Sequence, residues 1–282
     1  MSITNYQNLA AKLWQARQLG NVVTTDEQPT SLQSAYELLN EVTKASECEL
    51  LGYKLGATTD AALDLMQLSE PFVGPLLKGY CHQSGHTATI ETVNNPAIEA
   101  EFVLCMADDL PTNGPLSSAE VAKGVAWIAG GFEIVGARFA TMPAGRGLCT
   151  IGDGAGNHSV ISGKPNKQWR DLDIAALPVE LRINGNVCAS GMSNQSLHGS
   201  PLAMLTWLAN SINSAASQST TSTETATGFA SGSAAGHVMP ARGIKAGDII
   251  YCGTCTGLTP IQSGDTVVAD YGALGEVVTR IA

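Results

Sequence analysis

Apolar residues at helical spacing begin the chain and predict two helices. The first helix, over residues 5–19, carries apolar residues three or four positions apart: Leu9, Leu13, Ala16 and Leu19. Gly20 follows and ends that pattern. The second helix is predicted over residues 31–46, where Ser31 can act as the N-cap. We expect these amphipathic helices to cover a sheet.

After residue 50 the pattern changes to short apolar runs separated by glycine-rich turns, which predicts β-strands. Strands are predicted at residues 51–56, 98–106, 132–139, 179–183, 187–190, 247–254, 264–269 and 275–278. Asn184-Gly185 is a hairpin turn between two of them. Further helices are predicted at residues 61–68, 117–129 and 201–209. The prolines of residues 70–76 predict a loop, and the Ser, Thr, Ala and Gly of residues 211–236 predict a flexible surface excursion or lid.

The composition favours a single β-rich domain with a helical layer. The chain has 282 residues, of which 44% are hydrophobic and 14% charged, so it can bury a sizeable core. Thirty glycines favour a sheet over a helical bundle. We therefore expect an α+β fold with a closed or sandwich-like sheet. Residues 1–48 would form the N-terminal helical layer and residues 49–282 the β domain, with the excursion at 211–236 inside it.

Charge and cysteine usage restrict the partners and the compartment. A net charge of −10 argues against a nucleic-acid or anionic-membrane partner, because both require a basic surface. No apolar run reaches the length of a membrane span, and the N-terminus lacks a basic region followed by an apolar one. The seven cysteines are odd in number and scattered, which is poor material for a disulfide framework. We expect a cytoplasmic protein with a small-molecule ligand.

Cys252 and Cys255 form a lone C-x-x-C motif. A structural zinc ion would need two more ligands, and His82 and His86 with their neighbour Cys81 are the available cluster. Because no second, properly spaced pair exists, small buried thiols are the favoured interpretation.

Two glutamates, Glu99 and Glu101, alternate within a predicted strand and therefore project from the same side. Left alone they repel each other, and burial would push at least one towards protonation. A divalent cation removes that cost, and carboxylate oxygens suit Mg²⁺ or Mn²⁺. The alternative is a solvated edge strand with alternating glutamates.

Two more charged residues are set among apolar neighbours. Glu133 would be costly to bury without a partner, so it either joins the other carboxylates or pairs with Arg138 or Lys123. Lys54 either extends its ammonium group to the surface or is a desolvated lysine able to transfer a proton.

Five segments, in this order along the chain, carry a resemblance to a known family: Gly52-Tyr53-Lys54-Leu55-Gly56, Ile98-Glu99-Ala100-Glu101, Glu133-Ile134-Val135-Gly136-Ala137-Arg138, Gly247-Asp248-Ile249-Ile250 and Gly272-Ala273-Leu274-Gly275. Together they resemble the 2-keto-4-pentenoate hydratase branch of the fumarylacetoacetate hydrolase superfamily. The resemblance implies a mixed β-sandwich roll of that superfamily's C-terminal type, a homo-oligomer and a Mg²⁺ or Mn²⁺ site. It makes Glu99, Glu101 and Glu133 the metal ligands.

The resemblance also implies a substrate and a reaction. In that family the metal chelates the carboxylate and the 2-oxo oxygen of a small 2-oxoacid or its dienol, and as a Lewis acid it stabilises a dienolate. Lys54 is then the candidate proton carrier, and the candidate substrate-binding residues are Leu55, Asp153, Gly253 and Thr254. A hydratase of this kind adds water to a 2-hydroxy-2,4-dienoate or 2-oxo-enoate in aromatic catabolism, and the product is a 4-hydroxy-2-oxoacid.

Several positions depart from the family pattern. Phe72 follows Pro71 where many members carry Asp, and Gly154 and Gly156 stand where the family often has Asn and Ser. These changes remove polar groups that could position water, so 2-oxoacid decarboxylation is kept as an alternative to hydration. The histidine that precedes the late helix in the family is displaced here to His198.

Two further alternatives remain. A C–C hydrolase of acylpyruvate type needs a His–Glu pair to activate water, and neither Glu47 nor Glu49 has a histidine nearby in the sequence, which counts against it. A non-catalytic scaffold or binding protein has no need for a repulsive carboxylate cluster, so an enzyme is favoured.

Overall fold

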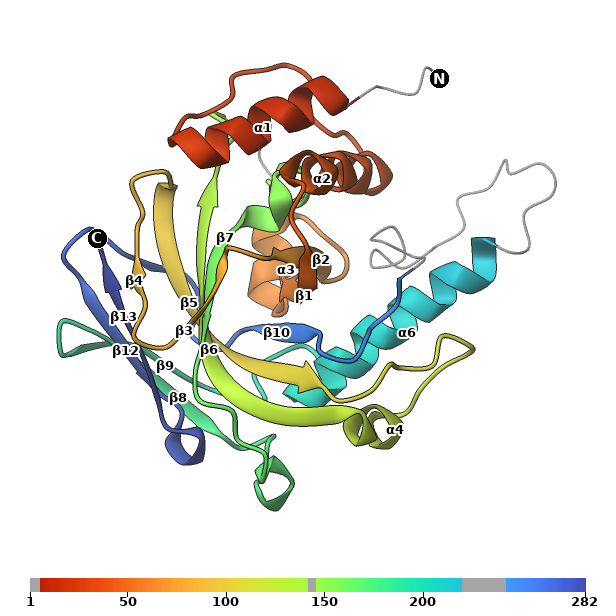
Figure 1. The fold of residues 1–282 in the computed structure, drawn as a ribbon, viewed down its shortest axis with the longest axis vertical. Helices are drawn as coiled ribbons and strands as arrows, with labels where there is room; N and C mark the ends of the chain where they lie inside the picture. Colours follow the sequence, from red (N-terminus) through yellow and green to blue (C-terminus); the bar gives the residue numbers. More distant parts are fainter. Residues whose placement is uncertain (1–5, 142–145, 220–241) are drawn as a thin grey trace.

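The computed structural model describes residues 6–141, 146–219 and 242–282, and in these residues it forms two β-sheets and six α-helices (Figure 1). The larger sheet has the strand order β2 (Phe72–Leu77), β1 (Leu50–Gly56), β10 (Ile249–Thr254), β5 (Asn94–Met106), β6 (Val125–Ala137), β7 (Asn157–Ser162) and β3 (Cys81–Gln83), and β11 (Thr259–Pro260) pairs with β5. The smaller sheet has the order β4 (Thr87–Ala88), β13 (Glu276–Ile281), β12 (Thr266–Asp270), β8 (Pro178–Ile183) and β9 (Asn186–Met192).

The helices lie around the two sheets. They are α1 (Gln7–Leu19), α2 (Leu32–Ser46), α3 (Asp60–Met66), α4 (Ser118–Lys123), α5 (Gly147–Gly152) and α6 (Pro201–Ser219). Figure 1 shows α1 and α2 above the curled larger sheet, the smaller sheet at its left and α6 at its right. The expected α+β roll with N-terminal helices is confirmed. No helix among the described residues is both long and apolar enough to cross a membrane.

The alternation of residues in β5 separates two environments. Ile98, Ala100 and Phe102 are fully buried in the main hydrophobic core, which also contains residues of the smaller sheet and of α6. Glu99 and Glu101 alternate with them and project from the opposite face. A pleated strand with this sequence can therefore bury its apolar residues only by gathering its glutamates on the other side.

The opposite face of the larger sheet is the inside of its curl. Leu76 of β2 and Val160 of β7 belong to strands near opposite edges of the sheet, yet they pack in one buried cluster with Val103 and Tyr251. Val103 lies two residues beyond Glu101 and so projects from the same face of β5. The glutamates therefore point into the space that the curled sheet encloses.

Most of the predicted elements are present. The N-terminal helix ends at Gly20, which has a positive φ of 72°, and Ser31 caps the second helix by accepting a hydrogen bond from the Ser34 N–H. The predicted hairpin joins β8 and β9 at Asn184 and Gly185, both with positive φ.

Three predictions of secondary structure are wrong. Residues 70–76 are not a loop, because β2 pairs with β1 throughout its length and Pro75 has its place within that pair. The helix predicted to continue to residue 129 ends at Lys123, and β6 begins at Val125 because Trp127 and Ile128 pair with β5. Helix α6 continues to Ser219, with Ile212 buried, so the predicted excursion cannot begin at residue 211; residues 220–236 lie outside the described residues.

Candidate metal centre

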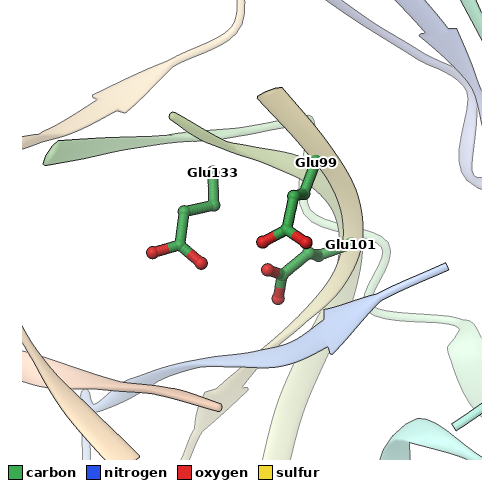
Figure 2. Close-up of side chains that lie close together, drawn as sticks. All are labelled: Glu99, Glu101 and Glu133. Atoms are coloured by element: carbon green, nitrogen blue, oxygen red, sulfur yellow. The ribbon is translucent and has the colours of Figure 1, made fainter. Parts of the chain in front are cut away.

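Three glutamates form one carboxylate cluster inside the curled sheet (Figure 2). Strands β5 and β6 are antiparallel, and their register places Glu99 directly opposite Glu133, with Glu101 two residues further along β5. One oxygen from each residue lies within 4.8 Å of the others, and Figure 2 shows all three side chains directed towards one another. Glu101 and Glu133 are fully buried, which rules out the solvated edge strand.

Burial and mutual repulsion make the ionised cluster costly. Burial, followed by the charge of Glu133, raises the pKa of Glu99 from 4.5 to about 7. The same two causes raise the pKa of Glu101 well above its ordinary value. The positive charge of Lys54 opposes both shifts. A bound cation would relieve the cost, since it replaces repulsion between carboxylates with attraction.

The hydrogen bonds leave one oxygen on each of two glutamates without a partner. Glu101 Oε2 accepts a hydrogen bond from the Gly253 N–H at 2.7 Å, and Glu133 Oε1 accepts one from Asn157 Nδ2 at 2.8 Å. Glu101 Oε1 and Glu133 Oε2 are buried and have no hydrogen-bond partner among the described residues. Such oxygens are the donors that a hard divalent ion prefers, so this residue set fits Mg²⁺ or Mn²⁺.

Lys54 is a buried member of the same site. Its Nζ lies 3.2 Å from Glu133 Oε1, and its side chain is 3% exposed, so it does not extend to the surface. This ion pair also answers the question of the partner of Glu133, because the predicted alternative Arg138 pairs with Asp153 instead. A lysine with restricted access to water beside a carboxylate is a suitable proton carrier.

Apolar residues also lie beside Lys54. The Phe72 ring centroid lies 5.0 Å from Lys54 Nζ, and the ring fills the space over Gly56, where an added Cβ would lie 2.1 Å from it. An added Cβ on Gly74 would lie 2.3 Å from the Ala155 methyl group and 3.4 Å from Lys54 Cε.

The structure brings together some of the predicted substrate-binding residues. Gly253 bonds to Glu101 through its N–H, and the Thr254 side chain forms a hydrogen bond with Glu99. Leu55 is in the main hydrophobic core, and Asp153 accepts a hydrogen bond from the Arg138 N–H at 2.6 Å. A role for each in substrate binding stays a prediction.

Sequence reasoning missed two residues of this region. Asn157 orients Glu133, and the only sign of it was its position at the end of a polar, glycine-rich turn. Thr58 follows β1, is fully buried and contacts Gly253, and its Oγ1 has no hydrogen-bond partner among the described residues. Its pattern in the sequence is that of an ordinary loop threonine.

The alternative zinc site is not formed. All seven cysteines are described and free, and the carboxylate cluster is the one group of three or more possible ligands found among the described residues. Cys252 and Cys255 are buried, as expected of small apolar thiols. The displaced His198 lies beside the Trp207 ring in a surface hollow between α4 and α6 that shares no residue with the cluster.

Comparison with known proteins gives a family match and relatives along most of the chain. The family model described as fumarylacetoacetate (FAA) hydrolase C-terminal matches residues 80–282. The chain is 25% identical over 270 residues to 2-hydroxyhexa-2,4-dienoate hydratase of Comamonas testosteroni, which covers 93% of this chain and 90% of that protein. It is 26% identical over 284 residues to 2-oxo-hept-4-ene-1,7-dioate hydratase of Escherichia coli, which covers 96% of each.

Solved structures give the same fold. The 4-oxalocrotonate decarboxylase of Pseudomonas putida G7, solved with magnesium and adipate, has a TM-score of 0.82 and 21% identity, and the match covers 100% of this chain and 99% of that one. The fumarylpyruvate hydrolase of Pseudomonas aeruginosa, solved with Mn²⁺ and pyruvate, has a TM-score of 0.57 and 15% identity, and the match covers 82% of this chain and 88% of that one. At these identities the likeness concerns the fold alone.

Proposed function

Because the chain belongs to the fumarylacetoacetate (FAA) hydrolase C-terminal family, we propose that it is a divalent-metal-dependent lyase that adds water to a 2-hydroxy-2,4-dienoate. The product would be a 4-hydroxy-2-oxoacid. The observation that carries the proposal is the buried carboxylate cluster, with two unpartnered oxygens and with Lys54 beside it. Hydratases among the relatives along most of the chain support hydration over the other reactions of the family.

Glu99, Glu101 and Glu133 would hold Mg²⁺ or Mn²⁺. The ion, when bound, supplies Lewis-acid stabilisation of the negative charge that develops on the 2-oxo oxygen of the substrate. Gly253 and Asn157 fix the two buried carboxylates by hydrogen bonds, so that their free oxygens stay directed at the ion.

Lys54 would move the proton. Ketonisation of a dienol removes a proton from the enol oxygen and adds one to the carbon chain, and water then adds at C4. Lys54 Nζ lies 3.2 Å from Glu133 Oε1 and 5.0 Å from the Phe72 ring centroid, and these contacts would hold it in place to donate to the chain. The Lys54 side chain is 3% exposed, so bulk water has little access to its ammonium group.

The other reactions considered for this sequence differ in their products. Decarboxylation would release CO₂, and C–C hydrolysis would release two acid fragments. The two glutamates considered as the base for hydrolysis lie at the surface, because Glu47 is exposed and Glu49 pairs with Lys78, which counts against this reaction. A scaffold protein would be expected to lose the carboxylates, since a buried repulsive cluster only destabilises it.

The test is incubation of the purified protein with 2-hydroxypenta-2,4-dienoate and Mg²⁺, with product analysis by NMR. We expect 4-hydroxy-2-oxopentanoate, and no product after EDTA treatment or with the Glu101→Gln variant. Release of CO₂ in place of the hydroxy acid would identify a decarboxylase.

A parallel thermal-unfolding assay should show that Mg²⁺ raises the melting temperature and that oxalate raises it further. No effect of either ligand would favour the scaffold. The homo-oligomer stays a prediction that sedimentation can test.

A further inference from the structure

A chain of hydrogen bonds links the N-terminal helix α1 to the carboxylate cluster, and it begins at Arg17. This buried arginine lies in the last turn of α1, outside residues 80–282 that the family model matches. Its Nη1 donates to the Asn157 carbonyl at 2.5 Å, and its Nη2 donates to the His158 carbonyl. The planar fork of a guanidinium group can bond two oxygens at once and so fixes their relative position. Asn157 is the residue whose side chain donates to Glu133.

The turn before Asn157 needs support from outside. Its three residues, 154–156, have positive φ values of 61°, 60° and 69°. This left-handed conformation is unfavourable for the alanine among them, so surrounding contacts have to hold the backbone. Arg138 supplies a second set of such contacts, because its Nη2 donates to the Asn157 carbonyl at 2.6 Å and its Nη1 to the Asp153 carbonyl at 3.1 Å. The Asn157 carbonyl thus accepts hydrogen bonds from two buried guanidinium groups.

Asn157 passes this constraint to a candidate metal ligand. Its Nδ2 donates to Glu133 Oε1 at 2.8 Å, while Glu133 Oε2 is buried and has no hydrogen-bond partner among the described residues. A shift of the Asn157 backbone would therefore turn the carboxylate and its free oxygen away from the ion. Groups that orient a metal ligand in this way usually contribute about 10–100-fold to metal affinity.

We propose that Arg17 is a positioning residue of the metal site, so that the N-terminal helical layer helps to set the metal affinity. This inference rests on the metal site of the proposed function. The sign of the effect distinguishes positioning from charge. Loss of a buried cation would by itself strengthen the binding of Mg²⁺, because like charges repel. Arg17→Met should instead weaken Mg²⁺ binding about tenfold, because Asn157 and Glu133 lose their orientation.

The test measures the Mg²⁺ affinity of the EDTA-treated full chain by calorimetry. Asn157→Ala should weaken Mg²⁺ binding about 10–100-fold. Leu13→Ala is the matched control for Arg17→Met, because Leu13 packs in the core of the N-terminal layer and its truncation destabilises α1 without removing a bond to Asn157. This control should change the affinity by less than about twofold. In the Asn157→Ala background Arg17→Met should cause no further loss, since the bond through which it acts is already absent.

The outcomes separate this inference from the proposed function. Unchanged or tighter Mg²⁺ binding by Arg17→Met would overturn the role of Arg17 and leave the proposed function intact. An equal loss in Leu13→Ala, or an equal further loss in the Asn157→Ala background, would do the same. No binding of Mg²⁺ or Mn²⁺ by the wild-type protein would overturn both proposals. Wild-type binding of Mg²⁺ without the 4-hydroxy-2-oxoacid product would overturn the reaction alone.

Arg17→Lys decides the question if Arg17→Met does not fold. It keeps the positive charge and lacks the planar fork that bonds the two carbonyls. Weaker Mg²⁺ binding by Arg17→Lys, present only where Asn157 is intact, would support the positioning role. Unchanged binding would overturn it.

Discussion

Without a divalent ion, the stability of this protein should fall as the pH rises. Burial and the charge of Glu133 raise the pKa of Glu99 from 4.5 to about 7 in the folded, metal-free protein. Between these two pH values the folded state keeps a proton that the unfolded state releases. The free energy of unfolding is therefore highest below pH 4.5 as far as Glu99 is concerned, and it decreases until about pH 7.

The size of this effect follows from the pKa difference. Each pKa unit corresponds to about 1.4 kcal/mol, so a rise from 4.5 to about 7 lowers the free energy of unfolding by about 3 kcal/mol. The raised pKa of Glu101 acts in the same direction. Mg²⁺ should cancel the loss, because it binds the ionised carboxylates of the folded state only.

Urea denaturation at pH 4.5 and pH 7.5 measures the effect, with EDTA or with Mg²⁺. Glu99→Gln removes the titrating group and should reduce the pH-dependent loss of the EDTA-treated protein by about 3 kcal/mol. Glu276→Gln changes an exposed glutamate of the smaller sheet and serves as the matched control. The electrostatic account of the cluster would be refuted if Glu99→Gln lost as much stability between the two pH values as the wild-type protein.

Four other variants test single contacts. Glu101→Gln should keep the fold, seen by circular dichroism, and lose Mg²⁺ affinity in calorimetry; unchanged turnover at saturating Mg²⁺ would contradict its role as a ligand. Lys54→Met should keep Mg²⁺ binding and reduce kcat about 10²–10⁴-fold. Loss of oxoacid binding alone would show that Lys54 binds the substrate and does not transfer the proton. Thr58→Val should raise the free energy of unfolding of the ligand-free protein by about 1 kcal/mol, because it removes a buried hydroxyl without a hydrogen-bond partner among the described residues. A lower free energy of unfolding, measured by urea denaturation, would show that the hydroxyl does have a hydrogen-bond partner. Arg17→Met should lower the free energy of unfolding by about 2–4 kcal/mol in the same assay, because buried Arg17 of α1 donates hydrogen bonds to the backbone carbonyls of Asn157 and His158. A decrease of less than about 1 kcal/mol would contradict that role.

The sequence predicted those parts of the fold that follow from local patterns. The spacing of Leu9 and Leu13 and the capping residue Ser31 were sufficient for the first two helices. The strand at residues 125–129 was missed because its apolar residues also fit a helix, and only pairing with β5 decides between the two. The strand at Phe72 was missed because Pro75 usually marks a loop, and its place in β2 depends on the register with β1.

The distinction between local patterns and the pairing of distant strands also applies to the site. Glu99 and Glu101 could be paired from alternation alone, since the strand itself fixes their common direction. Glu133 joins them through the register of two long strands, which no local pattern contains. Asn157 reaches Glu133 because β7 pairs with β6, and Thr58 reaches Gly253 because β1 pairs with β10, and these pairings join segments far apart in the chain. A carboxylate cluster is thus predictable where one strand carries it, while the groups that orient the cluster depend on how distant strands meet.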